Sequence, residues 1–177
     1  MMRMIVILVL FGSITVFSKK SKKVDDGTNE EGLDFLQKNA RRPGVITTAS
    51  GMQYRVLRPG RSNDAKPTLK NRVRIHIRGR RIDGEEFFES YSGRQPQMHF
   101  VKSVYPGMKE ALLMMRPGEK WEVFLPSELA FGAKGFGSIR DKIKVPPNSA
   151  VIFQIELIDV FNFPGDEELW SQEKTEL

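Results

Sequence analysis

The sequence predicts an α+β protein in which a mainly antiparallel β-sheet wraps around one short helix. Several segments alternate apolar and polar residues at the period of a half-buried strand, and one segment has the period of a helix. Strands precede and follow that helix along the chain. With 177 residues, 40% of them hydrophobic and 28% charged, the chain has the composition of one globular domain with extra residues at both ends.

Composition also excludes several classes of chemistry. The sequence has no cysteine, which excludes disulfides, thiol nucleophiles and cysteine-ligated metals. Its two histidines, His76 and His99, are isolated in the sequence, so we expect neither a histidine-based metal site nor a Ser-His-Asp triad. The expectation is therefore a protein that works without a metal or cofactor.

Residues 1–18 have the order of a secretory signal peptide, in which an arginine is followed by an apolar run and then by small and polar residues. The alternative is an uncleaved membrane anchor. The apolar run Met4–Phe17 has 14 residues, whereas a spanning helix needs about 20. The short run favours cleavage, after which we expect no membrane association.

Residues 19–46 are expected to form a charged linker and one short helix. The linker, residues 19–31, is rich in charge and poor in apolar side chains. Its basic start could bind nucleic acid, but five residues after a signal peptide are more typical of a solvated N-terminus. A helix is predicted over Gly32–Arg42 from the helical spacing of Leu33, Leu36 and Ala40.

Residues 47–161 are expected to form the folded domain, with a core of motifs at 71–161. The segment Gly51–Leu57 predicts a half-buried strand, with Gln53 and Arg55 on the side opposite Met52, Tyr54 and Val56. Arg72–Arg78 is the clearest strand, because Val73, Ile75 and Ile77 alternate with charged or polar residues. Asp83 and Gly84 then supply a hairpin turn.

Five arginines lie between Arg72 and Arg81, so nucleic-acid binding has to be considered. The alternation already explains these arginines as the solvated face of a strand. No aromatic side chain is interleaved with them to stack on bases, and secretion would separate the protein from most nucleic acid. We expect no nucleic-acid partner.

The substantial helix of the domain is predicted over Pro106–Arg116. Proline suits the first turn of a helix, Pro117 and Gly118 end it, and one face carries Met108, Ala111, Leu112 and Met115. Two further strands follow at Trp121–Leu125 and Ala150–Val160.

Residues 162–177 form an acidic tail that ends in Lys174-Thr175-Glu176-Leu177. These four residues are similar to the K-D-E-L signal that returns proteins to the endoplasmic reticulum, with threonine in place of the aspartate. The alternative is a frayed acidic end without an address. With the signal peptide, the tail favours the lumen of the endoplasmic reticulum, and secretion is the alternative destination.

The motifs of the chain resemble those of FKBP-type peptidyl-prolyl isomerases. In that family the motifs read G-x-x-F-D-S, V-I-x-G-W, A-Y-G and I-P-P-x-x-x-L-x-F-x-V-E-L. The corresponding segments occur here in the same order, at Gly84–Phe87, Val104–Gly107, Leu125–Gly132 and Val145–Leu157. The lead-in over residues 34–57 is similar to the subgroup called macrophage infectivity potentiator. The resemblance covers residues 34–161 and implies an FKBP-like sheet around a short helix.

The resemblance implies rotation of Xaa-Pro peptide bonds. That rotation crosses a barrier of about 18–20 kcal/mol because resonance keeps the amide planar. No bond breaks, so neither a nucleophile nor a metal is required. A pocket with apolar and aromatic walls favours the twisted amide, in which resonance is lost.

The resemblance also implies the site residues. Those matching the catalytic pocket are Phe87, Tyr105, Met108, Phe131 and Phe153. Those matching substrate-binding positions are Ile77, Phe88, Met98, Phe100, Val104 and Val145. We also expect the charged loop over residues 133–145, which is longer than is usual in the family, to overhang the pocket.

Several of these positions depart from the family pattern. Met108 stands where the family has a tryptophan, and Phe131 where it has the tyrosine of A-Y-G. Ile77 replaces a strand tyrosine and Phe88 replaces an aspartate, so a polar wall has become apolar.

Two functions remain open at this point. One is a prolyl isomerase that assists folding in the secretory pathway, and the other is a non-catalytic binding module or chaperone that uses the same groove. Both imply proline-containing polypeptide clients, and the apolar substitutions imply weak binding of macrolide inhibitors. We expect a monomer, because the predicted helix at 32–42 is too short for a stable coiled coil.

Overall fold

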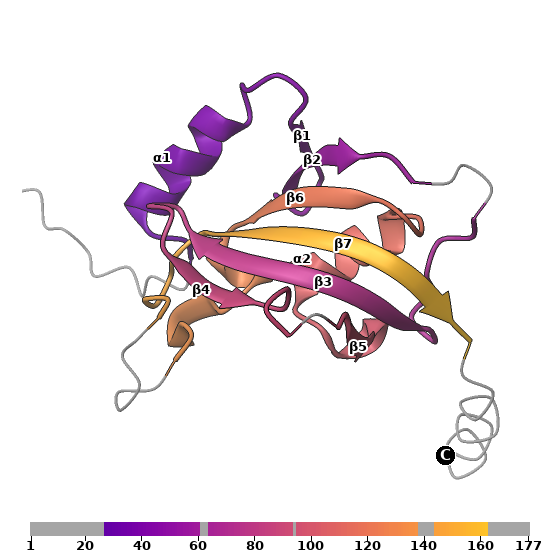
Figure 1. Cartoon of the computed structure of the whole chain (residues 1–177). Helices are drawn as coiled ribbons and strands as arrows, with labels where there is room; N and C mark the ends of the chain where they lie inside the picture. Colours follow the sequence, from indigo (N-terminus) through magenta and orange to yellow (C-terminus); the bar gives the residue numbers. More distant parts are fainter. Residues whose placement is uncertain (1–26, 61–63, 94, 138–143, 163–177) are drawn as a thin grey trace, which may run out of the picture.

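The computed structural model describes residues 27–60, 64–93, 95–137 and 144–162. A seven-stranded sheet with the order β1-β2-β6-β7-β3-β4 forms its centre, and β5 also pairs with β3 (Figure 1). All the strand pairs described are antiparallel. The strands are β1 Ile46–Thr47, β2 Gln53–Arg58, β3 Arg72–Arg81, β4 Glu86–Glu89, β5 Gln97–Phe100, β6 Lys120–Leu125 and β7 Val151–Phe161. The predicted α+β class with an antiparallel sheet is confirmed.

The long pair β3–β7 forms the spine of the sheet. Its register runs from Arg72 opposite Phe161 to Arg81 opposite Val151. Burial alternates along β3 as predicted, with Val73 and Ile75 fully buried. The strand then turns into β4, and Gly84 has a φ of +93° at this turn, a conformation that favours glycine.

Strands β4 and β5 lie end to end along the same edge of β3. β4 pairs with residues 78–80, whereas β5 pairs with residues 72–75. Between them, the Ile77 amide donates to the hydroxyl of Ser90 at 2.9 Å, and the Ser90 amide donates to the Ile77 carbonyl at 2.9 Å. The regular pairing along this edge of the sheet is therefore interrupted beside Ile77.

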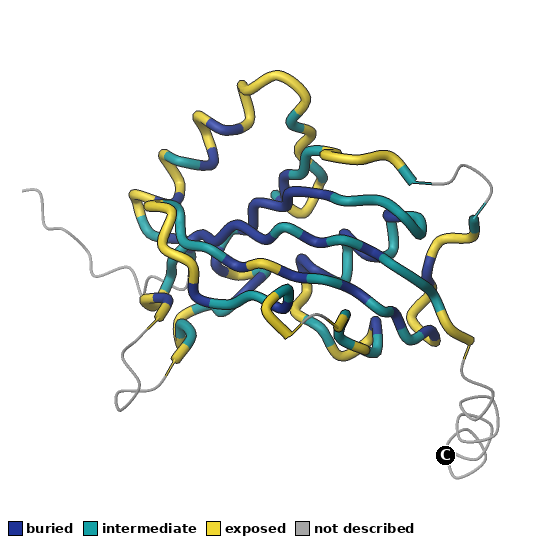
Figure 2. Tube along the Cα trace, in the orientation of Figure 1, coloured by how far each residue is buried: buried dark blue, intermediate teal, exposed yellow. Residues whose placement is uncertain are grey.

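Helix α2, Pro106–Met114, packs on the inner face of the sheet (Figure 1). The predicted face is confirmed, since Met108, Ala111, Leu112 and Met115 are all buried in the main core. A β-carbon on Gly107 would lie 2.4 Å from a methyl group of Leu125, so the missing side chain lets the helix approach β6 closely. Figure 2 shows the buried positions concentrated along the central strands and where α2 meets them.

Helix α1, Glu30–Asn39, covers part of the other face of the sheet (Figure 1). The prediction of a helix is confirmed, but its buried face is wrong: Leu33 is 56% exposed, Ala40 is exposed as well, and Leu36 packs with Phe124 and Ile152. The spacing of apolar residues misled the prediction, because the buried positions also include Gly32 and Asn39.

This helix changes the environment of β2. Gln53, expected on a solvated face, is 4% exposed. Its side-chain amide donates to the carbonyl of Leu36 at 2.9 Å, and its oxygen accepts from the Asn39 amide at 2.8 Å. A half-buried strand was predicted because nothing in the alternation shows that a helix covers the second face.

The expected linker ends earlier than predicted. Asn29 caps α1, its side-chain oxygen accepting from the Gly32 amide at 2.8 Å, and Thr28 is 4% exposed. The Thr28 amide and hydroxyl both donate to the Glu128 carboxylate at 2.8 Å. The Thr28 hydroxyl also accepts from the Ser127 amide at 2.7 Å. Thr28 is thereby fixed to the 3₁₀ turn η2, Ser127–Leu129, a hundred residues further along the chain.

The arginines of β3 face outward, beside carboxylates of neighbouring strands. Glu122 is 5% exposed and pairs with both Arg55, at 2.5 Å, and Arg80. Arg74 pairs with Asp159 on β7. These ion pairs explain the arginine-rich pattern as the polar outer face of the sheet.

The predicted signal peptide at 1–18 lies outside the described residues, as do the four C-terminal residues 174–177. Within the part of the chain that the structure does describe, no helix is long and apolar enough to cross a membrane.

Candidate active site

A pocket of about 500 Å³ opens beside the interrupted edge of the sheet, where the start of α2 meets β3, β4 and β7. Eight of the eleven predicted site residues line it together: Ile77, Phe87, Phe88, Val104, Tyr105, Met108, Phe131 and Phe153. The other lining residues are Gln97, His99, Ser103, Pro106 and Phe136, which sequence reasoning missed.

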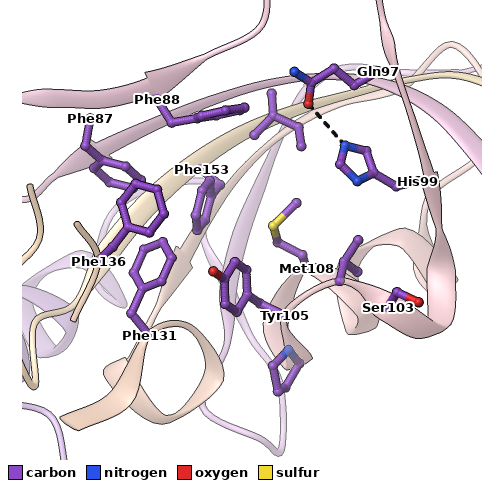
Figure 3. A pocket seen from close by; sticks show the side chains of 13 residues that line it. Phe87, Phe88, Gln97, His99, Ser103, Tyr105, Met108, Phe131, Phe136 and Phe153 are labelled. Atoms are coloured by element: carbon purple, nitrogen blue, oxygen red, sulfur yellow. Dashed lines mark hydrogen bonds between the residues drawn. The ribbon is translucent and has the colours of Figure 1, made fainter. Parts of the chain in front are cut away.

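Phenylalanine rings form one wall of the pocket (Figure 3). Phe87 on β4 meets Phe153 on β7 edge to face, with ring centroids 5.8 Å apart at 87°. Phe131, just after η2, lies edge-on to Phe87 at 5.6 Å and stacks on Phe136 at 4.9 Å. We call these four residues the phenylalanine wall. Such contacts fix the rings relative to one another and keep the wall free of hydrogen-bonding groups.

Gly79 in the middle of β3 makes room for this wall. A β-carbon there would lie 2.6 Å from Phe87 and 2.9 Å from Phe153, distances at which something must move. The two rings therefore pack directly over the backbone of β3, which is a common reason for glycine inside a strand.

The N-terminal end of α2 supplies the floor and part of the mouth. Met108 is 4% exposed and its thioether lies inside the pocket (Figure 3). Tyr105, the residue before the helix, is 41% exposed, and its ring packs edge-on against Phe131 at 4.8 Å. A flexible methionine thus stands where the resemblance placed a rigid tryptophan.

The structure places three predicted residues outside the pocket lining. In β5, Gln97 and His99 point inward, so Met98 points away and is 48% exposed. Phe100 follows the same alternation, and its ring lies under Arg72 at 4.0 Å. The assignment of Met98 and Phe100 was therefore one residue out of register in β5, since neighbouring side chains of a strand face opposite sides.

The third residue is Val145, which is fully buried in the main core rather than exposed to the pocket. Its backbone pairs with Phe136 in an isolated bridge. The expected loop over residues 133–145 therefore contributes Phe136 to the lining, while residues 138–143 lie outside the described part of the chain. No sequence motif singled out Phe136, whereas strand alternation could have found Gln97 and His99.

Gln97 and His99 are the polar pair of the pocket. Nε2 of His99 and Oε1 of Gln97 are 3.2 Å apart, a hydrogen bond drawn in Figure 3. Burial lowers the pKa of His99 below its ordinary value, because the charged imidazolium loses water there. His99 is therefore neutral at pH 7.

This geometry suits binding rather than bond-breaking chemistry. No aspartate or glutamate is among the described lining residues, and no group of three acidic or histidine side chains in the described residues could hold a metal. The rings and the methionine form a dry cavity for an uncharged apolar group, with hydrogen-bonding groups on one side. Fold and site together define a protein with an antiparallel sheet around a short helix and an apolar, ring-lined pocket between them.

The chain belongs to the family of FKBP-type peptidyl-prolyl cis-trans isomerases. The sequence model of that family matches residues 63–158, and a model described as the domain amino terminal to FKBP-type peptidyl-prolyl isomerase matches residues 11–56. The second match overlaps the predicted signal peptide over residues 11–18.

Curated relatives agree with this assignment. The chain is 40% identical over 130 residues to an FKBP-type 22 kDa peptidyl-prolyl cis-trans isomerase from Escherichia coli, covering 73% of this chain and 60% of the relative. It is 40% identical over 131 residues to the peptidyl-prolyl cis-trans isomerase Mip of Coxiella burnetii, covering 74% of this chain and 54% of the relative. The chain thus spans little more than half the length of these relatives.

Solved structures show the same fold. FkpA from Escherichia coli superposes with a TM-score of 0.68 at 33% identity, covering 76% of this chain and 59% of FkpA. A peptidyl-prolyl cis-trans isomerase from Pseudomonas syringae superposes with a TM-score of 0.65 at 35% identity, covering 73% of this chain and 90% of its own.

Proposed function

We propose that this protein is a peptidyl-prolyl cis-trans isomerase that rotates Xaa-Pro bonds in polypeptide clients. The observation that carries the proposal is the phenylalanine wall above the Met108 floor. A proline ring fits this apolar cavity of about 500 Å³. Homology to proteins named as such isomerases supports the same reaction.

The pocket would act by stabilising the twisted amide. A planar Xaa-Pro amide owes its barrier of about 18–20 kcal/mol to resonance, which is lost at the half-rotated state. A twisted amide carries less charge separation than a planar one, so moving it from water to apolar walls costs less. Phe87, Phe131 and Phe153 therefore favour the half-rotated amide over the planar one.

Turnover of Xaa-Pro peptides tests this proposal. We expect the protein to accelerate isomerisation, and Phe131→Ala to lower kcat/KM by about tenfold, or about 1.4 kcal/mol. Phe161→Ala is the matched control, because this phenylalanine lies at the end of β7 and does not line the pocket. Unchanged turnover in Phe131→Ala would contradict the role given to the wall.

A non-catalytic binding module is the second candidate. It is favoured by Ile77 and Phe88, which put apolar groups where the family pattern has a tyrosine and an aspartate. Binding of Xaa-Pro peptides without any acceleration of their isomerisation would select this candidate.

Partners and location follow as further parts of the proposal. We propose export from the cytosol, supported by the leader-like residues 1–18 and by a relative from Legionella longbeachae named outer membrane protein MIP. Retention in the endoplasmic reticulum rests on residues 174–177 alone, and secretion is the alternative. Deleting these four residues in a secreting eukaryotic cell distinguishes the two, because only a retained protein moves into the medium.

We also propose a monomer with low affinity for macrolide inhibitors. Helix α1 packs on its own sheet, where Leu36 contacts Phe124 and Ile152. The face of this helix that carries Leu36 is therefore already covered within one chain. Light scattering at micromolar concentration gives the mass, and a dimer mass would contradict the proposal.

A further inference from the structure

The pocket has a second wall whose chemistry differs from that of the phenylalanine wall. Gln97 and His99 form it, and Figure 3 shows them on the side away from Phe87 and Phe131. Both come from β5, whose alternation directs them inward while Met98 stays exposed. A ligand whose ring lies among the phenylalanines would therefore place its neighbouring residue near two hydrogen-bonding side chains.

The hydrogen bond between Gln97 and His99 determines which donors and acceptors the two side chains can present to a ligand. Because Oε1 of Gln97 only accepts, Nε2 of neutral His99 carries the proton and Nδ1 is an acceptor. The amide nitrogen of Gln97 keeps both of its donors, since no described residue accepts from it. Protonation of His99 would turn Nδ1 into a further donor toward the ligand.

Lysines flank several of the residues that line the pocket along the chain. Lys102 precedes the lining residue Ser103, but its ammonium lies over the outward-facing ring of Phe100, 5.6 Å from the ring centroid. Lys134 lies in the sequence between Phe131 and Phe136, on the side of the phenylalanine wall. Lys144 precedes Val145, which pairs with Phe136. Lys134 and Lys144 are exposed and form no ion pair with another described residue.

On the neighbouring strands β3 and β4, the charged side chains near this wall pair with other groups or lie on the outer side of the sheet. On β3, Arg74 pairs with Asp159, and Arg72 lies over Phe100 on the outer side. On β4, the carboxylate of Glu86 pairs with Arg78, and that of Glu89 accepts from the amides of Tyr91 and Ser92. The titratable group that the start of α2 contributes to the lining is the hydroxyl of Tyr105, which Figure 3 shows directed away from His99. None of the described carboxylates lines the pocket.

We propose that the pocket selects Xaa-Pro bonds in which Xaa is acidic, and that Gln97 and His99 receive the carboxylate of Xaa. This specificity rests on the proposed isomerase function and deepens it. The Gln97 amide donates to the carboxylate at neutral pH, and Lys134 and Lys144, which flank residues of the opposite wall, add positive charge near the pocket. The preference strengthens as the pH falls toward the pKa of His99, because protonated His99 adds a charged donor while the carboxylate of Xaa stays ionised.

Proton linkage makes the proposal testable by binding alone. A carboxylate beside His99 stabilises the imidazolium, so it raises the pKa that burial has lowered. Binding of an acidic peptide therefore takes up a proton when the pH lies between the His99 pKa of the free protein and the higher pKa of the complex, and binding of a neutral peptide does not. Calorimetry in two buffers with different ionisation enthalpies measures that uptake.

The experiment compares four peptides that differ only in the residue before proline, namely Glu, Gln, Leu and Lys. We expect the Glu peptide to bind about tenfold more tightly than its isostere Gln at pH 5.5, with a smaller ratio at pH 7.5. We expect Lys to bind most weakly. Equal affinities for Glu and Gln at both pH values would overturn the proposal.

Variants assign the effect to the two residues. His99→Phe should abolish proton uptake and the pH dependence, and Gln97→Met should reduce the preference for Glu at pH 7.5. His76→Phe is the matched control, because His76 stacks on Tyr91 at 4.5 Å and does not line the pocket. A Glu preference that survives in both pocket variants would overturn the proposal.

Failure of this inference is distinguishable from failure of the proposed function. Turnover of all four peptides without a preference for Glu keeps the isomerase and removes the specificity. Preferential binding of the Glu peptide without turnover keeps the specificity and makes the protein a binding module.

Discussion

Four side chains of the pocket determine which of its sides are apolar and which can form hydrogen bonds. Ile77 and Phe88 make one side apolar, whereas Gln97 and His99 bring hydrogen-bonding groups to another. The resemblance places a polar wall where Ile77 and Phe88 lie, whereas the hydrogen-bonding side chains of this pocket come from β5. A ligand matched to the family pattern would meet apolar groups where it offers hydrogen bonds.

Macrolide binding tests this rearrangement. We expect the unaltered protein to bind macrolide inhibitors weakly, and the triple variant Ile77→Tyr, Phe88→Asp, Phe131→Tyr to bind them at least tenfold more tightly. Each restored hydrogen bond contributes about 0.5–1.5 kcal/mol. Isothermal titration measures both affinities.

Single reversions are expected to fail, because an aspartate at position 88 without its tyrosine partner would be a poorly satisfied charge. Tight binding by the unaltered protein would show that these residues do not set the affinity.

At the scale of elements, the segment before α1 connects the N-terminal region to the pocket. Thr28 is bonded to Ser127 and Glu128 of η2, and Phe131 of the phenylalanine wall follows three residues later. The position of η2, and with it that of Phe131, therefore depends on a residue nearly a hundred positions earlier.

The hydroxyl of Thr28 tests this dependence. Thr28→Val keeps the shape but leaves the Ser127 amide without its acceptor and a Glu128 oxygen without its donor, at a cost of about 1–3 kcal/mol. We expect urea unfolding to show this loss and kcat/KM to fall with it. Thr28→Ser, which keeps the hydroxyl, should restore most of both. Equal behaviour of the two variants would show that the hydroxyl does not position η2.

Elements that show their own periodicity were predictable from sequence. β3, α2 and β7 were found because each buries a face against one core, and the pattern of that face is local. The buried face of α1 was not, since Gly32 and Asn39 are buried through contacts with distant segments. The pocket positions taken from motifs lie together except Val145, which is buried in the core. The segment β5 has no motif and was placed one residue out of register.

For the whole molecule, two partly buried carboxylates link folding to pH. Burial alone would raise the pKa of Glu156, but the hydrogen bond and charge of Arg58, together with the charge of Lys120 and the hydrogen bond from Tyr91, lower the pKa. Burial alone would likewise raise the pKa of Glu128. Hydrogen bonds from its own backbone and from Thr28 lower that pKa instead. Both groups release their protons more readily in the folded state than in the unfolded chain.

Acid unfolding follows from these shifts. A carboxylate with a lowered folded pKa contributes stability that is present above its unfolded value of 4.5 and is lost as the pH falls through the folded pKa. We expect the free energy of unfolding to decrease below about pH 4.5, as measured by urea titrations between pH 3 and 7. Arg58→Met should flatten this dependence, whereas an unchanged slope in that variant would remove Glu156 from the explanation.

At Gly79, the shape of the cavity depends on the absence of a side chain, whereas the pairing of the sheet depends on the backbone. A methyl group added there would force the ring of Phe87 or Phe153 from its position, while strand β3 keeps its hydrogen bonds to β7. A one-carbon substitution there would disturb two rings that belong both to the core and to the pocket lining. In a population under selection, this position is therefore constrained by the rings above it rather than by the strand that contains it.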